Sequence, residues 1–97
     1  MDHNSEEAGW REFLQLCLHV DDVTTLDKLL RLHLTQEEQE AIAMRCLIVR
    51  ELLKEEKTQR VIAQALQVSI AKITRGSNSL KLVDPDLRAY LLAQIKS

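Results

Sequence analysis

The chain has 97 residues, with 13 Lys or Arg, 15 Asp or Glu and a formal net charge of −2. Only two Gly and one Pro argue against a sheet joined by tight turns, whereas abundant Leu, Ala, Gln, Glu, Lys and Arg favour helices. The sequence has no apolar run long enough to cross a membrane and no signal-peptide pattern, so we expect a small all-α cytoplasmic protein, either one domain or part of an oligomer.

Two helices are predicted before residue 35. Ser5 can cap the first, and apolar side chains then recur on one face at helical spacing. These are Trp10, Phe13, Leu14, Cys17 and Leu18. Asp22 or Thr24 begins the second helix, which carries Leu26, Leu29, Leu30 and Leu32. We expect residues 1–4 to form a flexible tail and residues 5–97 to form a single helical domain.

A longer third helix is predicted to begin at Thr35. The run Thr35-Gln-Glu-Glu38 is a capping box, in which the threonine and glutamate side chains bind each other's backbone N–H groups. Apolar residues follow at helical spacing as far as Leu53, with Arg45 among them.

The two cysteines are far apart, and each lies on an apolar-periodic stretch. We therefore expect Cys17 and Cys46 to be reduced core thiols, with neither a disulfide nor a metal site. The three histidines show no ligand spacing with them, at His3, His19 and His33.

Residues 58–81 have the spacing of a helix-turn-helix. Thr58 can cap one helix and Ser69 a second, with a short break around Gln67. Ala63 supplies the small residue needed where two steeply crossing helices approach each other. The apolar residues that would fill the wedge between them are Ile62, Leu66, Val68 and Ile73. Gln67 occupies a position where glycine is commonest because φ is often positive, and a non-glycine residue there costs about 1 kcal/mol.

The charge distribution singles out the same region. Residues 57–83 hold five of the 13 basic residues and none of the 15 acidic ones, so the rest of the chain carries a net charge of −7. One basic, Ser/Thr/Asn-rich segment on an acidic body indicates a single face for a polyanion. The alternative is a pair of amphipathic helices in an ordinary bundle.

Asp84 and Pro85 predict a last helix, since they form a cap followed by a first-turn proline. Its apolar residues include Leu87, Tyr90, Leu91 and Ile95. The first, second and last helices are short and strongly apolar, so we expect them to bury against a second copy in an intertwined homodimer. An ordinary monomeric core is the alternative. A twofold dimer suits a DNA-binding protein that needs two recognition helices one turn of duplex apart.

The chain closely resembles the tryptophan repressor family over residues 9–95. The resemblance rests on Ile70-Ala-Lys-Ile-Thr-Arg-Gly-Ser-Asn-Ser-Leu-Lys81, on Leu34-Thr-Gln-Glu-Glu and on the Arg45…Glu51-Leu-Leu stretch. It implies a homodimeric transcriptional repressor that binds palindromic operator DNA when L-tryptophan is bound as corepressor. Such a protein would control genes of tryptophan biosynthesis or uptake. No enzymatic activity, metal or further cofactor is implied.

In the family, the ligand lies between the long third helix and the recognition helix, and the resemblance implies its contacts here. Arg75 would pair with the ligand carboxylate, and Arg45 would cover one face of the indole. Gly76 would let the ring approach the backbone. The polar rim and the carbonyl acceptors for the ligand ammonium would come from Thr35, Ser79 and the chain around Leu32.

Three of these residues also have purely structural alternatives. Arg45 can be a surface cation, Thr35 only a helix cap and Gly76 a helix stop. Glycine inside a helix costs about 1 kcal/mol relative to alanine, which favours a functional reason for Gly76.

The resemblance also implies DNA contacts from both helices of the motif. Gln59 and Arg60 would lie near phosphates. The tip of the recognition helix would face the major groove with Ser69, Ile70, Ala71, Lys72 and Thr74. Additional contacts with the DNA backbone would come from Arg45, Ser77, Asn78 and Lys81.

Two positions depart from the best-known members of the family, Lys72 replacing Thr and Ala63 replacing a basic residue. Lys72 can donate to guanine O6 or N7, or hold a phosphate. Because it lies early in the recognition helix, we favour recognition of a base edge. The resemblance therefore does not imply the same operator sequence for this chain.

Two other functions remain open. One keeps the fold and the DNA but has a different effector or none, and the intact set of ligand residues argues against it. The other is a helical protein-interaction module whose basic residues are incidental.

Overall fold

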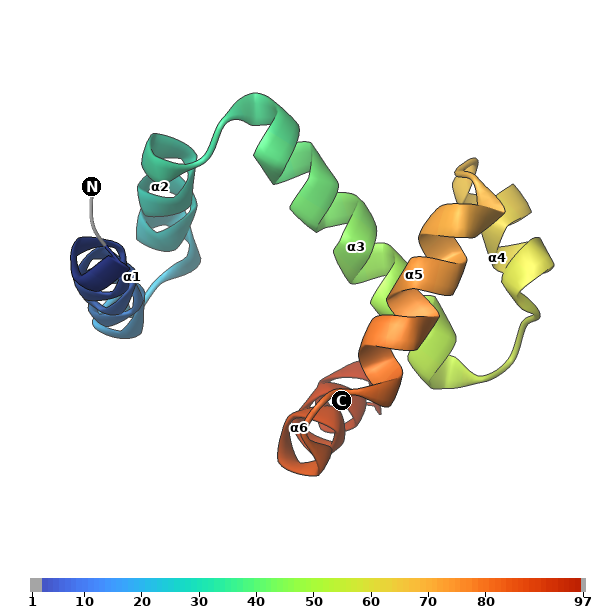
Figure 1. Ribbon diagram of the computed structural model, residues 1–97. Helices are drawn as coiled ribbons and strands as arrows, with labels where there is room; N and C mark the ends of the chain where they lie inside the picture. The colour runs from blue at the N-terminus through green and yellow to red at the C-terminus, as the bar shows by residue number, and fades with distance from the viewer. Residues whose placement is uncertain (1–2, 97) are drawn as a thin grey trace. The chain divides into compact units, whose positions relative to one another are not determined.

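The computed structural model describes residues 3–96, and all regular structure in that range is α-helical (Figure 1). The helices are α1 (His3–Leu18), α2 (Val23–His33), α3 (Gln36–Lys54), α4 (Gln59–Leu66), α5 (Ile70–Lys81) and α6 (Pro85–Lys96). The predicted all-α fold of six helices is confirmed for this range. The chain divides into two compact units, which meet in sequence between Gln39 and Glu40. A single domain over residues 5–97 stays a prediction.

Four predicted helix starts are confirmed by their capping hydrogen bonds. Asp22 Oδ1 accepts from the Thr25 N–H at 2.7 Å, and this bond lowers the pKa of the Asp22 carboxyl. The capping box is complete: Thr35 N–H donates to Glu38 Oε1 at 2.8 Å, and Glu38 N–H donates to Thr35 Oγ1 at 3.1 Å. At the other two starts, the Thr58 side chain accepts from the Val61 N–H, and the Asp84 side chain accepts from the Leu87 N–H.

Two predicted caps are corrected. α1 begins at His3, so Ser5 lies inside the first turn of the helix and does not cap it. Of the predicted tail, residues 3 and 4 are therefore helical, while residues 1–2 lie outside the described range. Ser69 holds the N-cap position of α5, but its side chain makes no capping hydrogen bond in the structure as described.

In the first unit, aromatic rings stack within α1 and join α1 to α2 through Phe13 and His33. The ring centroids of Trp10 and Phe13 are 5.8 Å apart, and those of Phe13 and His33 are 5.0 Å apart. Arg31 Nε donates to Asp27 at 2.9 Å and its Nη1 donates to Gln39 Oε1 at 3.1 Å, which ties α2 to the first turn of α3.

In the second unit, the core joins α3 to the helix-turn-helix. Its buried residues are Ile48, Ile62, Ala63 and Ile73, with Met44, Leu52, Leu66 and Val68 packed around them. The predicted wedge is thus confirmed. Gln67 has φ 58° and ψ 45°, the left-handed conformation expected at this turn, and Val68 N–H donates to the Ala63 carbonyl at 3.1 Å.

The prediction of two core cysteines is wrong for Cys46. Both thiols are free, but Cys17 is half-buried and Cys46 is exposed. Met44, Ile48 and Leu52 recur every four residues along the core face of α3, and a residue two positions from Ile48 lies on the opposite side. Cys46 therefore points away from the core that α3 forms with the helix-turn-helix.

Large apolar side chains stay uncovered on both units. Trp10 is 61% exposed and Leu32 80%, while Tyr90 on α6 is 59% exposed. Leu14, Leu18, Val23, Leu82 and Leu87 are exposed as well. Among the described residues, no helix is long and apolar enough to span a membrane, and no three His, Cys, Asp or Glu residues gather as a metal site.

Candidate functional site

A glycine brings α5 close to α3. A Cβ placed on Gly76 would lie 3.0 Å from Ile48 Cγ2 and 3.5 Å from Leu52 Cδ1. Gly76 is therefore needed for helix packing. Its alternative role as a helix stop is wrong, because α5 continues without positive φ to Lys81.

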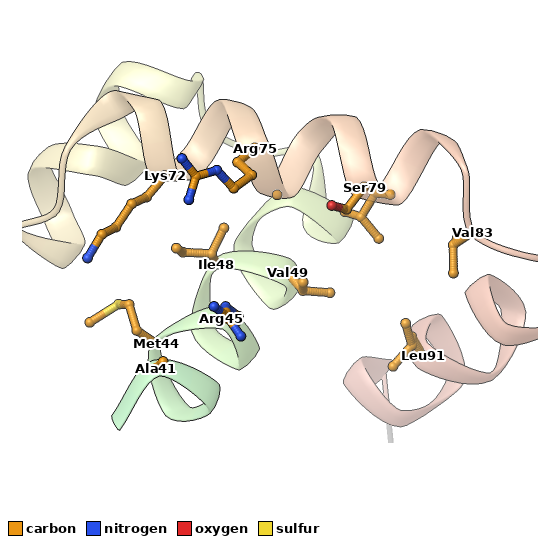
Figure 2. A pocket seen from close by; sticks show the side chains of 12 residues that line it. Ala41, Met44, Arg45, Ile48, Val49, Lys72, Arg75, Ser79, Val83 and Leu91 are labelled. Atoms are coloured by element: carbon orange, nitrogen blue, oxygen red, sulfur yellow. The ribbon is translucent and has the colours of Figure 1, made fainter. Parts of the chain in front are cut away.

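A pocket of about 560 Å³ opens in the second unit beside this contact (Figure 2). Residues of α3, α5 and α6 and of the α5–α6 connection line it: Ala41, Met44, Arg45, Ile48, Val49, Lys72, Arg75, Gly76, Ser79, Leu80, Val83 and Leu91. Most of these side chains are apolar. A concave, largely apolar pocket with a few polar groups is the usual form of a small-molecule site.

The charged groups of this pocket are all cationic. Figure 2 shows Lys72 extending from α5 toward the side on which α3 carries Met44, while the Arg75 side chain runs along α5 toward Lys72. The three cations, Arg45, Lys72 and Arg75, are exposed, no carboxylate lines the pocket, and none of the three makes an ion pair with any described residue. The pocket therefore favours a ligand that combines an apolar portion with an anionic group.

Three basic residues at the end of α3 and in the α3–α4 connection share one carboxylate partner. Glu51 is only 8% exposed and accepts from Lys57 Nζ at 2.9 Å, Arg50 Nε at 3.3 Å and Lys54 Nζ at 3.4 Å. The Lys57 hydrogen bond, with help from Lys54, lowers the Glu51 pKa from 4.5 to about 2. These contacts tie the α3–α4 connection to α3.

The structure brings together four of the six predicted ligand residues. Arg45, Arg75, Gly76 and Ser79 all line the pocket. Leu32, near the end of α2, and Thr35, at the cap of α3, belong to the first unit, and their predicted ligand contacts stay predictions.

The sequence analysis did not assign Lys72 to this pocket. The signal was present in the spacing, because Lys72 lies three residues before Arg75 and seven before Ser79, on one side of a helix. The apolar lining residues Met44, Val49, Val83 and Leu91 were also missed as pocket residues, since helical periodicity does not separate a pocket wall from a core.

Apart from Arg45, which lies on α3, the predicted DNA contacts lie on α4, on α5 and at the cap of α5. Gln59 and Arg60 occupy the first turn of α4, with Gln59 half-buried. The Thr74 hydroxyl lies 2.9 Å from Gln59 Oε1 and 3.1 Å from the Ile70 carbonyl, either of which can accept its proton. Ser77 is half-buried, and the remaining predicted contacts are exposed, at Ser69, Ile70, Ala71, Lys72, Asn78 and Lys81.

Comparison with known proteins agrees with this architecture. The sequence model of the family described as Trp repressor protein matches residues 8–95. A Trp operon repressor homolog of Chlamydia caviae is 47% identical over 91 residues, which are 94% of this chain and 90% of that protein. Homologs of the same name from Vibrio vulnificus and Histophilus somni are 44% and 40% identical, over 94% and 89% of this chain and 89% and 81% of their own lengths.

Proposed function

The chain belongs to the Trp repressor family, whose members are transcription regulators and not enzymes, and from this premise we propose a tryptophan-activated repressor. In this proposal, a cytoplasmic homodimer binds palindromic operator DNA through α4 and α5 when L-tryptophan occupies the pocket. The regulated genes would serve tryptophan biosynthesis or uptake.

The observation that carries the proposal is the pocket against α5. Its apolar wall suits an indole ring, and its unpaired cations suit the carboxylate of an amino acid. In the proposed complex, Arg75 pairs with the carboxylate and Arg45 stacks on the indole. Gly76 and Ser79 border the ligand, while Thr35 and the carbonyls around Leu32 bind its polar groups.

The two sides of α5 support a mechanism of activation. Lys72, Arg75 and Ser79 line the pocket, whereas Ile73 is fully buried in the core. The exposed tip of α5, around Ile70 and Ala71, is left for the major groove. A ligand that binds one orientation of α5 more tightly than another shifts the protein toward that orientation. The shift can be no larger than the difference between the ligand's affinities for the two orientations. Operator DNA favouring the same orientation must then tighten ligand binding by the same factor.

The exposed apolar side chains support the proposed dimer. α1, α2 and α6 carry apolar residues that are more than half exposed in a single chain, including Trp10, Leu32 and Tyr90. Covering them with a second copy would place two α5 helices in a twofold arrangement that matches a palindromic site.

The test is a selection of bound sequences from a random duplex pool under saturating L-tryptophan, followed by titration of the enriched site with and without the ligand. We expect a palindrome whose affinity rises with L-tryptophan and not with L-leucine at the same concentration. Equal affinity in both titrations would leave a DNA-binding protein with another effector or none. Enrichment of no sequence, together with no L-tryptophan binding in calorimetry, would instead favour a protein-interaction module.

A further inference from the structure

We propose that Lys72 is a ligand-binding residue, which holds the anionic group of the pocket ligand together with Arg75. The proposal rests on the proposed function for the identity of the ligand. It goes beyond that function because it assigns Lys72, predicted from the sequence as a DNA contact, to the ligand pocket.

The first support is the position of Lys72 on α5. It lines the pocket with Arg75, Gly76 and Ser79, and its side chain extends toward the α3 side of the pocket (Figure 2). Ala71, the next residue back, does not line the pocket and is exposed. The first turn of α5 therefore presents two surfaces, and Lys72 belongs to the one that faces α3.

The second support is the separation of the cations into paired and unpaired groups. Arg50, Lys54 and Lys57 bind Glu51, and Arg88 lies 4.0 Å from Glu55. Lys72 has no ion pair among the described residues and shares its pocket with two further cations and no carboxylate. Like charges gathered in this way are relieved by an anion, so a carboxylate in the pocket gains from Lys72 as well as from Arg75.

The two roles of Lys72 can be told apart without DNA. A lysine ammonium that donates to the ligand carboxylate stabilises the bound ligand whether or not DNA is present, whereas one that donates only to guanine O6 or N7 does not. The two roles of Lys72 thus make opposite predictions for ligand affinity measured without DNA. If it holds the ligand, affinity depends on Lys72; if it contacts only DNA, affinity does not.

The experiment is calorimetric titration of L-tryptophan into the full-length protein without DNA, at several salt concentrations. Lys72→Met should weaken binding about two- to fivefold at low salt, the range for an exposed ion pair. The ligand affinity of this variant should also depend less on salt than that of the unaltered protein. Lys72→Arg should restore most of the affinity and of the salt dependence. Lys28→Met, which removes an exposed cation on α2, is the matched control and should change neither quantity.

An unchanged affinity and salt dependence in Lys72→Met would overturn the proposal. A loss of about one unit in the salt slope of operator binding per protomer would then assign Lys72 to a phosphate instead. Failure of the proposed function is distinguishable, because in that case the unaltered protein itself would not bind L-tryptophan. Circular dichroism of each variant shows whether the helices are intact.

Discussion

The Thr74 hydroxyl on α5 lies 2.9 Å from Gln59 Oε1 at the start of α4. This is a side-chain hydrogen bond between the two helices of the helix-turn-helix, outside the apolar wedge that holds them together. Both residues were predicted to contact DNA, and the bond links them before any DNA is present. It adds a polar contact between the two helices to the packing of Ile62 and Ile73.

Thr74→Val should weaken this link without disturbing the wedge. Valine keeps the shape and the β-branching but cannot donate to Gln59, so we expect a loss of about 0.5–1.5 kcal/mol in the free energy of unfolding. Urea denaturation at fixed protein concentration measures it. Asn78→Ala, an exposed change later on α5, is the control and should stay within about 0.5 kcal/mol. A Thr74→Val variant as stable as the unaltered protein would show that the hydroxyl serves only the Ile70 carbonyl.

Gly76→Ala tests the close approach of α5 and α3. Alanine is the better helix former by about 1 kcal/mol, yet its Cβ would lie 3.0 Å from Ile48 Cγ2, and Ile48 is buried. Overpacking costs about 1–3 kcal/mol, so we expect a net destabilisation of about 1 kcal/mol. Its cost should shrink in an Ile48→Ala background, which removes the methyl group in the way. Equal costs in both backgrounds would contradict the packing role.

The sequence predicted most of the fold because the deciding signals are local. The caps at Asp22, Thr35, Thr58 and Asp84 each depend on residues within three positions, and the wedge follows from helical spacing. The predicted cap at Ser5 was wrong because a good capping residue is also tolerated within the first turn of a helix. Local signals thus fix which segments are helical better than they fix the first residue.

Contacts between distant segments were less predictable. The approach of Gly76 to Ile48 joins residues of different helices, and no pattern within either helix reveals it. Lys57 likewise pairs with Glu51 because the α3–α4 connection folds back on α3. For the same reason, the sequence did not predict Lys72 as a pocket residue, because its side of α5 becomes a pocket wall only where α3 runs alongside.

The Glu51 carboxylate should make stability depend on pH. Its pKa falls from the ordinary 4.5 to about 2 on folding, so the unfolded chain binds more protons between these values. The stabilisation is complete above pH 4.5 and is lost as pH falls toward 2. Glu51→Gln should reduce the free energy of unfolding by about 1.5–3 kcal/mol at pH 7, with a smaller reduction at pH 3.

Urea denaturation of both proteins at pH 7, 5 and 3 checks this. Glu55→Gln is the matched control, since that side chain is 78% exposed and 4.0 Å from Arg88, and it should have little effect at any pH. If the difference in the free energy of unfolding between Glu51→Gln and the unaltered protein stays constant from pH 7 to pH 3, titration of Glu51 is not its source.

Arg75→Ala should weaken L-tryptophan binding by about 1.5–3 kcal/mol, the range for a hydrogen bond to a charged group. The fold should survive, because Arg75 is exposed and has no ion-pair partner among the described residues. Calorimetric titration gives the affinity, and Lys28→Ala controls for the loss of one positive charge. Unchanged affinity in a folded Arg75→Ala variant would show that the ligand carboxylate binds elsewhere.

The exposed apolar residues predict an obligate dimer. Leu32 and Leu82 are 80% and 88% exposed in one chain, which is costly unless a second copy covers them. The folded state would then exist only as a dimer, and its thermal midpoint should rise with protein concentration. Leu32→Ser should lower the midpoint and reduce that dependence, whereas Asn78→Ser, at an exposed polar position, should not. Sedimentation velocity provides the mass. A monomeric mass together with a midpoint independent of concentration would mean that these side chains face solvent, and that two recognition helices meet only on the DNA.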